Sequence, residues 1–197
     1  MKKMSSKHDI IVKNIEESIL VKRSIADHMV NLIGEMAMLI IEAYKTGGKV
    51  ILFGNGGSAA DAQHIASELM GRFALERRPF PAVAITTNTS VLTAVANDYG
   101  YEDVFSRQVE ALADEKDVII AISTSGNSPS VIKAVNKAHE RGAKTIGLTG
   151  GNGGKLAPLV DLALIVPSNS TPRIQEAHIT IGHIVCELVE KELSSEL

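Results

Sequence analysis

The sequence predicts an α/β domain, with a five-stranded parallel sheet flanked by helices. Short β-rich runs alternate with helical stretches, and runs such as KVILF and VIIAIS are apolar at successive positions. Strands of this kind are buried on both faces, as in a parallel sheet with helices on each side. At 197 residues the chain is long enough for a substantial core, and we expect one domain over residues 1–197.

An N-terminal helical extension is predicted over residues 1–46. Apolar residues recur at spacings of three and four from about Ile10 to Ala43, and Gly47 and Gly48 end this amphipathic pattern. The five strands are predicted at Lys49 to Phe53, Ala82 to Thr86, Asp117 to Ser123, Lys144 to Thr149 and Leu162 to Val166. The intervening helices are expected to begin near Ser58, Ser90, Val104, Pro129 and Lys155, and a long last helix to run from about Thr171 to Leu193.

Composition and charge exclude several classes of protein. The hydrophobic content of 45% and the formal net charge of -3 are ordinary, so no broad attraction to nucleic acid is expected. The start of the chain lacks the apolar stretch of a signal peptide, and no segment approaches the roughly 20 apolar residues of a membrane span. The single cysteine, Cys186, suits a small buried hydrophobe. We therefore expect a cytoplasmic protein without nucleic-acid or membrane partners.

Two loops at the carboxyl ends of predicted strands have the composition of ligand-binding loops. The first, FGNGGSAADAQH, places glycines where backbone amides approach a ligand, with Ser58 positioned to cap the next helix. The second, STSGNSPS, offers several hydroxyls before Pro129, with Ser128 as the expected cap. Hydroxyls and helix-end amides together suit a phosphate, although both loops are also compatible with purely structural turns. The Walker motif GxxxxGK[ST] is absent, which disfavours nucleotide hydrolysis.

Two predicted helices carry residues suited to acid–base chemistry or metal binding. His64 and Glu68 are four positions apart and share one helix face. On the last helix, Gln175 and His183 fall on one broad face, and Gly182 beside the histidine would leave room for a ligand to approach. Histidines on helices are also common as ordinary surface or core residues, and spacing alone leaves that alternative open.

Five segments, in order, carry a resemblance to a known family: GNGGSAADAQHIASEL, VANDYG, AISTSGNSPSVIKA, LTGGNGGKLA and TPRIQEAHITIGH. Together they resemble the bacterial phosphoheptose isomerases, which are built on a sugar isomerase (SIS) domain. The resemblance covers residues 47–190 and includes the N-terminal helices in kind. STSGNS alone would indicate only the wider SIS superfamily.

The resemblance implies conversion of sedoheptulose 7-phosphate to a manno-heptose 7-phosphate for cell-surface glycans such as lipopolysaccharide. It also implies a homotetramer with active sites at subunit interfaces and one zinc ion per subunit. The implied metal ligands are His64, Glu68, Gln175 and His183, with Glu68 and His183 catalytic. The implied substrate contacts are Asn55, Gly56, Gly57, Ser58, Glu68, Asn97, Asp98, Ser123, Thr124, Ser125, Ser128 and Gln175.

One position departs from the family pattern. Some relatives carry an acidic residue directly before RIQE, where this chain has Pro172. A substrate contact from a carboxylate is therefore not expected at this position, whereas proline suits the first turn of the last helix.

Three alternatives share parts of the pattern. A non-catalytic SIS scaffold that binds the replication initiator would share the loops, but it has no need of Glu68 or His183. A sugar-phosphate-sensing regulatory domain would require a partner module, for which residues 1–46 leave little room. Other SIS isomerases act on arabinose 5-phosphate or hexulose phosphates, and here the RIQE and His183 segment favours heptose.

Overall fold

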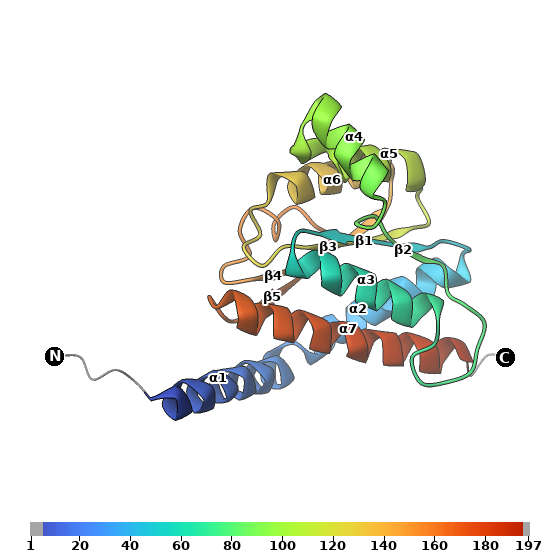
Figure 1. Cartoon of the computed structure of the whole chain (residues 1–197). Helices are drawn as coiled ribbons and strands as arrows, with labels where there is room; N and C mark the ends of the chain where they lie inside the picture. The colour runs from blue at the N-terminus through green and yellow to red at the C-terminus, as the bar shows by residue number, and fades with distance from the viewer. Residues whose placement is uncertain (1–5, 195–197) are drawn as a thin grey trace.

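A computed structural model describes residues 6–194, where a five-stranded parallel sheet lies between two layers of helices (Figure 1). The strand order is β2-β1-β3-β4-β5, and every neighbouring pair is parallel. The strands are β1 (Val50–Gly54), β2 (Ala82–Ala84), β3 (Val118–Ile122), β4 (Lys144–Gly150) and β5 (Leu162–Val166). The predicted fold class is therefore confirmed.

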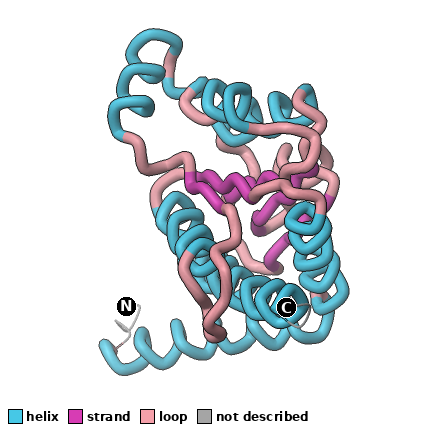
Figure 2. Tube along the Cα trace, turned by 90° about the vertical axis from the view of Figure 1, so that its right-hand side faces the viewer, coloured by secondary structure: helices cyan, strands magenta, loops and turns pink. Residues whose placement is uncertain are grey.

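Helices cover both faces of the sheet, as the apolar strands require (Figures 1 and 2). Val50 and Leu52 of β1 pack into the core beneath α2, α3 and α7, whereas Ile51 and Phe53 pack into the core beneath α5 and α6. The helices are α2 (Val30–Lys45), α3 (Gly57–Met70), α4 (Thr89–Tyr99), α5 (Ser106–Leu112), α6 (Pro129–Glu140) and α7 (Thr171–Ser194), with a 3₁₀ turn η1 (Tyr101–Asp103).

The chain order across the sheet creates a switch point between β1 and β3. From β1 the chain crosses to β2 on one side, and the later strands are added on the other side. In open α/β sheets, ligands bind beyond the carboxyl ends of the strands at such a point. Here those ends lead into the glycine-rich loop after Gly54 and the hydroxyl-rich loop after Ile122.

The predicted N-terminal extension is helical and consists of two helices. α1 (Lys7–His28) begins at a capping box between Ser6 and Asp9, and a break at Met29 separates it from α2. Within residues 6–194, no single helix passes a length and composition test for a membrane span; the α1 and α2 pair passes it jointly but is bent by 73°.

Several predicted boundaries need correction. The strand predicted from Ala82 to Thr86 stops at Ala84, and the helix predicted to begin near Val104 begins at Ser106. The helix expected near Lys155 is only a series of turns. Pro158 lies within this short stretch and lacks the amide that a continuing helix would need.

Candidate functional site

The glycine-rich loop joins β1 to α3 at the carboxyl edge of the sheet. Gly56 is the N-cap residue of α3, with a φ of 57° that residues with side chains rarely adopt. The prediction that Ser58 caps this helix is therefore wrong, because Ser58 lies inside the first turn and is buried. Glycine makes the tight turn that allows the helix to begin earlier.

His64 and Glu68 project from the same side of α3, as their spacing predicts. His64 Nε2 lies 3.1 Å from Glu68 Oε1. The two side chains are 47% and 24% exposed, respectively. A ligand can therefore reach both groups from solvent.

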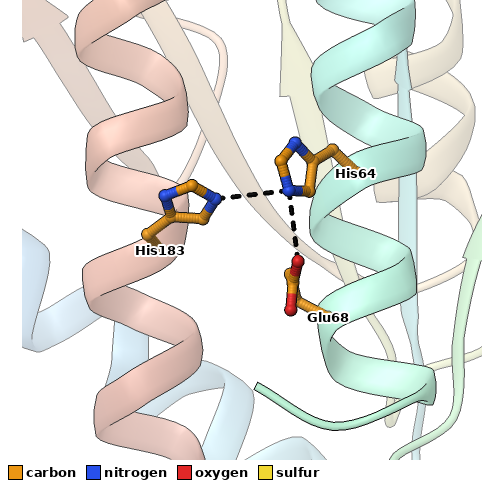
Figure 3. A group of neighbouring side chains, drawn as sticks. All are labelled: His64, Glu68 and His183. Atoms are coloured by element: carbon orange, nitrogen blue, oxygen red, sulfur yellow. Dashed lines mark hydrogen bonds and ion pairs between the residues drawn. The ribbon is translucent and has the colours of Figure 1, made fainter. Parts of the chain in front are cut away.

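His183 reaches the same point from α7, as Figure 3 shows. Its Nε2 lies 3.3 Å from His64 Nε2. The helices pack closely beside it, since a Cβ added at Gly182 would lie 2.7 Å from Ile65 Cδ1. The expectation that Gly182 leaves room for a ligand is wrong, because Ile65 fills that space. The glycine instead allows α7 to approach α3.

The cluster of His64, Glu68 and His183 has the donor set of a zinc site. Their ligand atoms all lie within 4.8 Å of one another. Two imidazole nitrogens and a carboxylate oxygen are common zinc ligands in catalytic sites, which keep a further position open. With zinc bonds of about 2.0 to 2.1 Å, tetrahedral ligand atoms stand about 3.3 Å apart. The separations of 3.1 Å and 3.3 Å that join His64 Nε2 to Glu68 Oε1 and to His183 Nε2 are close to this value.

Gln175 lies near the start of α7, against the glycine-rich loop. A Cβ added at Gly57 would lie 2.3 Å from Gln175 Nε2, so the Gln175 side chain lies directly against this glycine. His183 is more than two turns further along α7, about 12 Å along the helix axis. The structure thus gathers three of the four predicted metal ligands and places Gln175 beside a predicted substrate loop. A role for Gln175 as fourth ligand stays a prediction.

The hydroxyl-rich loop leads from β3 into α6. Ser128 is the N-cap residue and Pro129 the first helical residue, as predicted. Among the residues that the structure describes, however, the Ser128 hydroxyl contacts Ser123 Oγ at 3.3 Å and makes no hydrogen bond to an amide of α6. The first turn of α6 therefore lacks a side-chain cap from Ser128, which suits the binding of an anion.

A cavity of about 350 Å³ opens beside this loop. Thr124 and Ser125 form one part of its wall, and the start of α7 forms another through Thr171 and Ile174. Its size is within the range of small-molecule sites. The remaining lining residues are Gly150, Gly151, Asn152, Ser168 and Asn169.

Tyr101 connects the segment after α4 to the glycine-rich loop and, through Asn55, to the first turn of α6. Its hydroxyl donates to Asn55 Oδ1 at 2.8 Å, and Asn55 Nδ2 donates to Ser130 Oγ at 3.1 Å. Asn97 and Asp98, predicted from the same segment, lie at the exposed end of α4 and bond to each other at 2.8 Å. Tyr101 and Ser130 were not predicted as site residues, although Ser130 lies within the AISTSGNSPSVIKA motif and Tyr101 directly follows VANDYG.

Asp61 is a third residue of the site that the motifs did not predict. It lies one turn before His64 on α3, and its Oδ2 is buried without a hydrogen-bond partner among residues 6–194. Burial raises the pKa of this carboxyl group, and the nearby His64 opposes the rise. Its signal in the sequence is the spacing of three to His64, which puts both on neighbouring positions of the helix surface.

Comparison with known proteins gives matches over nearly the whole chain. The SIS domain family profile matches residues 15–150. The phosphoheptose isomerase of Aquifex aeolicus is 57% identical over 181 residues, which cover 92% of this chain and 95% of that protein. A phosphoheptose isomerase structure from Neisseria gonorrhoeae has a TM-score of 0.90 and 43% identity, covering 94% of this chain and 100% of that one.

A phosphoheptose isomerase structure from Francisella tularensis gives a TM-score of 0.92 at 38% identity, over 95% of this chain and 100% of that one. The resemblance drawn from the five sequence segments is thus confirmed by both sequence and fold. This chain belongs to the phosphoheptose isomerase family of SIS domain proteins.

Proposed function

We propose that this enzyme converts D-sedoheptulose 7-phosphate to D-glycero-D-manno-heptose 7-phosphate, the first step of heptose precursor biosynthesis. Its membership of the phosphoheptose isomerases supports this reaction. The observation that carries the proposal is the convergence of His64, Glu68 and His183 from two helices, beside the loops at the switch point of the sheet. Such a group supplies the base and the acid that an aldose-ketose isomerisation needs.

In the proposed mechanism, Glu68 removes the proton from C1 of the ketose, giving an enediol-like intermediate. Glu68 then returns a proton to C2, while His183 donates a proton to the oxygen on C2 and accepts one from the oxygen on C1. Atoms and charge balance over the cycle, and both groups return to their starting state. The partial exposure of the Glu68 side chain, whose Oε1 contacts His64, supports this assignment.

His64, Glu68 and His183 would hold the zinc ion, with Gln175 as the further predicted ligand. When bound, zinc would polarise the carbonyl and hydroxyl oxygens of the substrate. The donor set and its spacing support this role. One ion per subunit and a cytoplasmic location belong to the same proposal.

The substrate phosphate would bind at the hydroxyl-rich loop. Ser123, Thr124, Ser125 and Ser128 supply the hydroxyls there, and the N-terminus of α6 supplies a favourable dipole. The remaining predicted contacts with the sugar are Asn55, Gly56, Gly57, Ser58, Asn97, Asp98 and Gln175.

A homotetramer with active sites at subunit interfaces completes the proposal. On α1, Ile10, Ile15 and Leu20 are 51%, 56% and 62% exposed. An apolar groove of about 460 Å³ lies between α1, α2 and α7. Apolar surface of this kind is expected to be covered by other subunits.

The decisive experiment incubates the purified, zinc-loaded protein with sedoheptulose 7-phosphate and follows formation of the aldose. We expect conversion, and a loss of at least about tenfold in rate after zinc is removed with a chelator, reversed by added zinc. Unphosphorylated sedoheptulose is the control and should react poorly, because it lacks the group that the second loop binds. Failure of the loaded enzyme to form aldose would reject the function; an unchanged rate after verified zinc removal would reject only the metal.

Tyr101→Phe should raise KM about fivefold with a smaller effect on kcat. The variant loses one neutral hydrogen bond to Asn55, worth about 1 kcal/mol, and so loosens the turn that carries Gly56 and Gly57. Steady-state kinetics with the heptulose phosphate test this. Tyr99→Phe is the matched control, since Tyr99 is an exposed tyrosine near the end of α4 whose ring packs against Arg107. Equal KM values for the two variants would show that the Tyr101 contact is unimportant.

A further inference from the structure

The loop between α3 and β2, residues 71–81, is folded around a buried ion pair. The Arg77 and Glu190 side chains are each 1% exposed, and Arg77 Nε lies 2.9 Å from Glu190 Oε1. Glu190 comes from α7, near its end. The pair therefore links the loop that follows Glu68 to the helix that carries His183.

Glu190 also binds the backbone of this loop. Its carboxylate accepts hydrogen bonds from three successive amides, those of Phe73 at 3.0 Å, Ala74 at 2.8 Å and Leu75 at 2.9 Å. With Arg77, the carboxylate thus has four donors around it. A buried charge with this many partners is costly to disturb, because loss of a partner leaves it unpaired.

Arg77 also binds the C-terminus of α3, where this loop begins. Its guanidinium donates to the carbonyls of Glu68 at 2.9 Å, Leu69 at 3.0 Å and Gly71 at 3.2 Å. The last carbonyls of a helix have no partner within the helix, so these bonds complete its final turn. The backbone of Glu68 is held directly by this arrangement.

Phe73 connects this loop to α7 through a contact with His183. Its ring centroid lies 5.8 Å from that of His183, with the rings tilted by 43°. The Phe73 amide is fixed by Glu190, which lies two turns beyond His183 on the same helix. Backbone and ring of Phe73 therefore both attach to α7, on the side where His183 meets His64.

We propose that Phe73, held by the Arg77 and Glu190 pair, is a positioning residue that sets the placement of the His183 ring relative to His64 and Glu68. This inference rests on the proposed function of that cluster. A purely structural loop would need the ion pair to close the fold, but it would not need an aromatic ring against the imidazole. The half-buried state of Phe73 makes it the member of the group that can be replaced with the least harm to folding.

The test compares Phe73→Ala and Phe73→Tyr with the parent enzyme. We expect Phe73→Ala to lower kcat about tenfold with little change in KM, and to weaken zinc binding about tenfold in competition with a chromophoric chelator. Phe73→Tyr retains the ring and should restore both values to within about twofold of the parent. Leu75→Ala is the matched control, because Leu75 is exposed on the same loop and the hydrogen bond from its backbone amide to Glu190 remains.

Three outcomes would overturn the inference: parent values of kcat and zinc affinity in Phe73→Ala, an equal loss in Leu75→Ala, or failure of Phe73→Tyr to rescue. If Phe73→Ala folds poorly, Phe73→Leu takes its place, and kcat is referred to the folded, zinc-loaded fraction. A kcat per loaded site equal to that of the parent would then assign the loop to stability alone. The parent rate, measured alongside, separates this result from failure of the proposed function.

Discussion

Replacing Glu68 with glutamine should lower kcat by about 10²- to 10⁴-fold, the usual contribution of a general base. Glutamine keeps the size of the side chain but cannot accept the carbon-bound proton. The loops that follow β1 and β3 are unchanged, so inorganic phosphate should still bind and stabilise the protein against thermal unfolding. The measurement is steady-state turnover of sedoheptulose 7-phosphate, with zinc content determined for each sample because Glu68 also belongs to the ligand cluster.

Glu76→Gln is the matched control for this substitution. Glu76 is a highly exposed carboxylate on the loop after α3, in a surface pair with Arg72. The Glu76→Gln variant loses the same charge at an exposed position outside the ligand cluster, so its turnover should stay near that of the parent. A Glu68→Gln enzyme that binds zinc fully and turns over at the parent rate would show that another group removes the proton.

The sheet was predictable because its strands carry a strong local signal. Val50 to Phe53 and Val118 to Ile122 are apolar on both faces, and such runs are typical of strands in a parallel sheet that is covered on both sides. The break at Met29 was not predictable, since the apolar spacing continues across it. The bend depends instead on how α2 packs against α7 and the sheet. The helix predicted near Lys155 failed for a local reason, because Pro158 in that stretch lacks the amide that a continuing helix would need.

The site was predictable to the extent that its residues share a helix. The spacing of His64 and Glu68 predicts their contact, whereas the approach of His183 depends on Gly182 packing against Ile65. Spacing could not predict what Gln175 contacts, because residues two turns apart on one helix face can contact different parts of the protein. The links through Tyr101 and Glu190 join residues far apart in the sequence, and no local pattern marks them.

His178 should make the stability of the fold depend on pH in a range where most carboxylates are already ionised. It lies on α7, is 0% exposed, and its Nε2 is 3.1 Å from the carbonyl oxygen of Thr149. Burial lowers its pKa from 6.5 to about 4, opposed in part by the hydrogen bond to Thr149. Below pH 6.5 His178 becomes protonated in the unfolded chain but stays neutral in the folded protein. The contribution of His178 to the free energy of unfolding is therefore complete above pH 6.5 and is lost as the pH falls toward 4.

The expected loss from this one group is about 2 kcal/mol in the free energy of unfolding between pH 7.5 and pH 5.0. Urea denaturation at the two pH values measures it, with His178→Gln as the reference. Glutamine can donate to the Thr149 carbonyl but does not titrate, and zinc release or carboxylate protonation would affect both proteins alike. The parent should therefore lose about 2 kcal/mol more than the variant on acidification. Equal losses would mean that His178 is protonated in the folded protein at pH 5.0, which its burial against the end of β4 makes unfavourable.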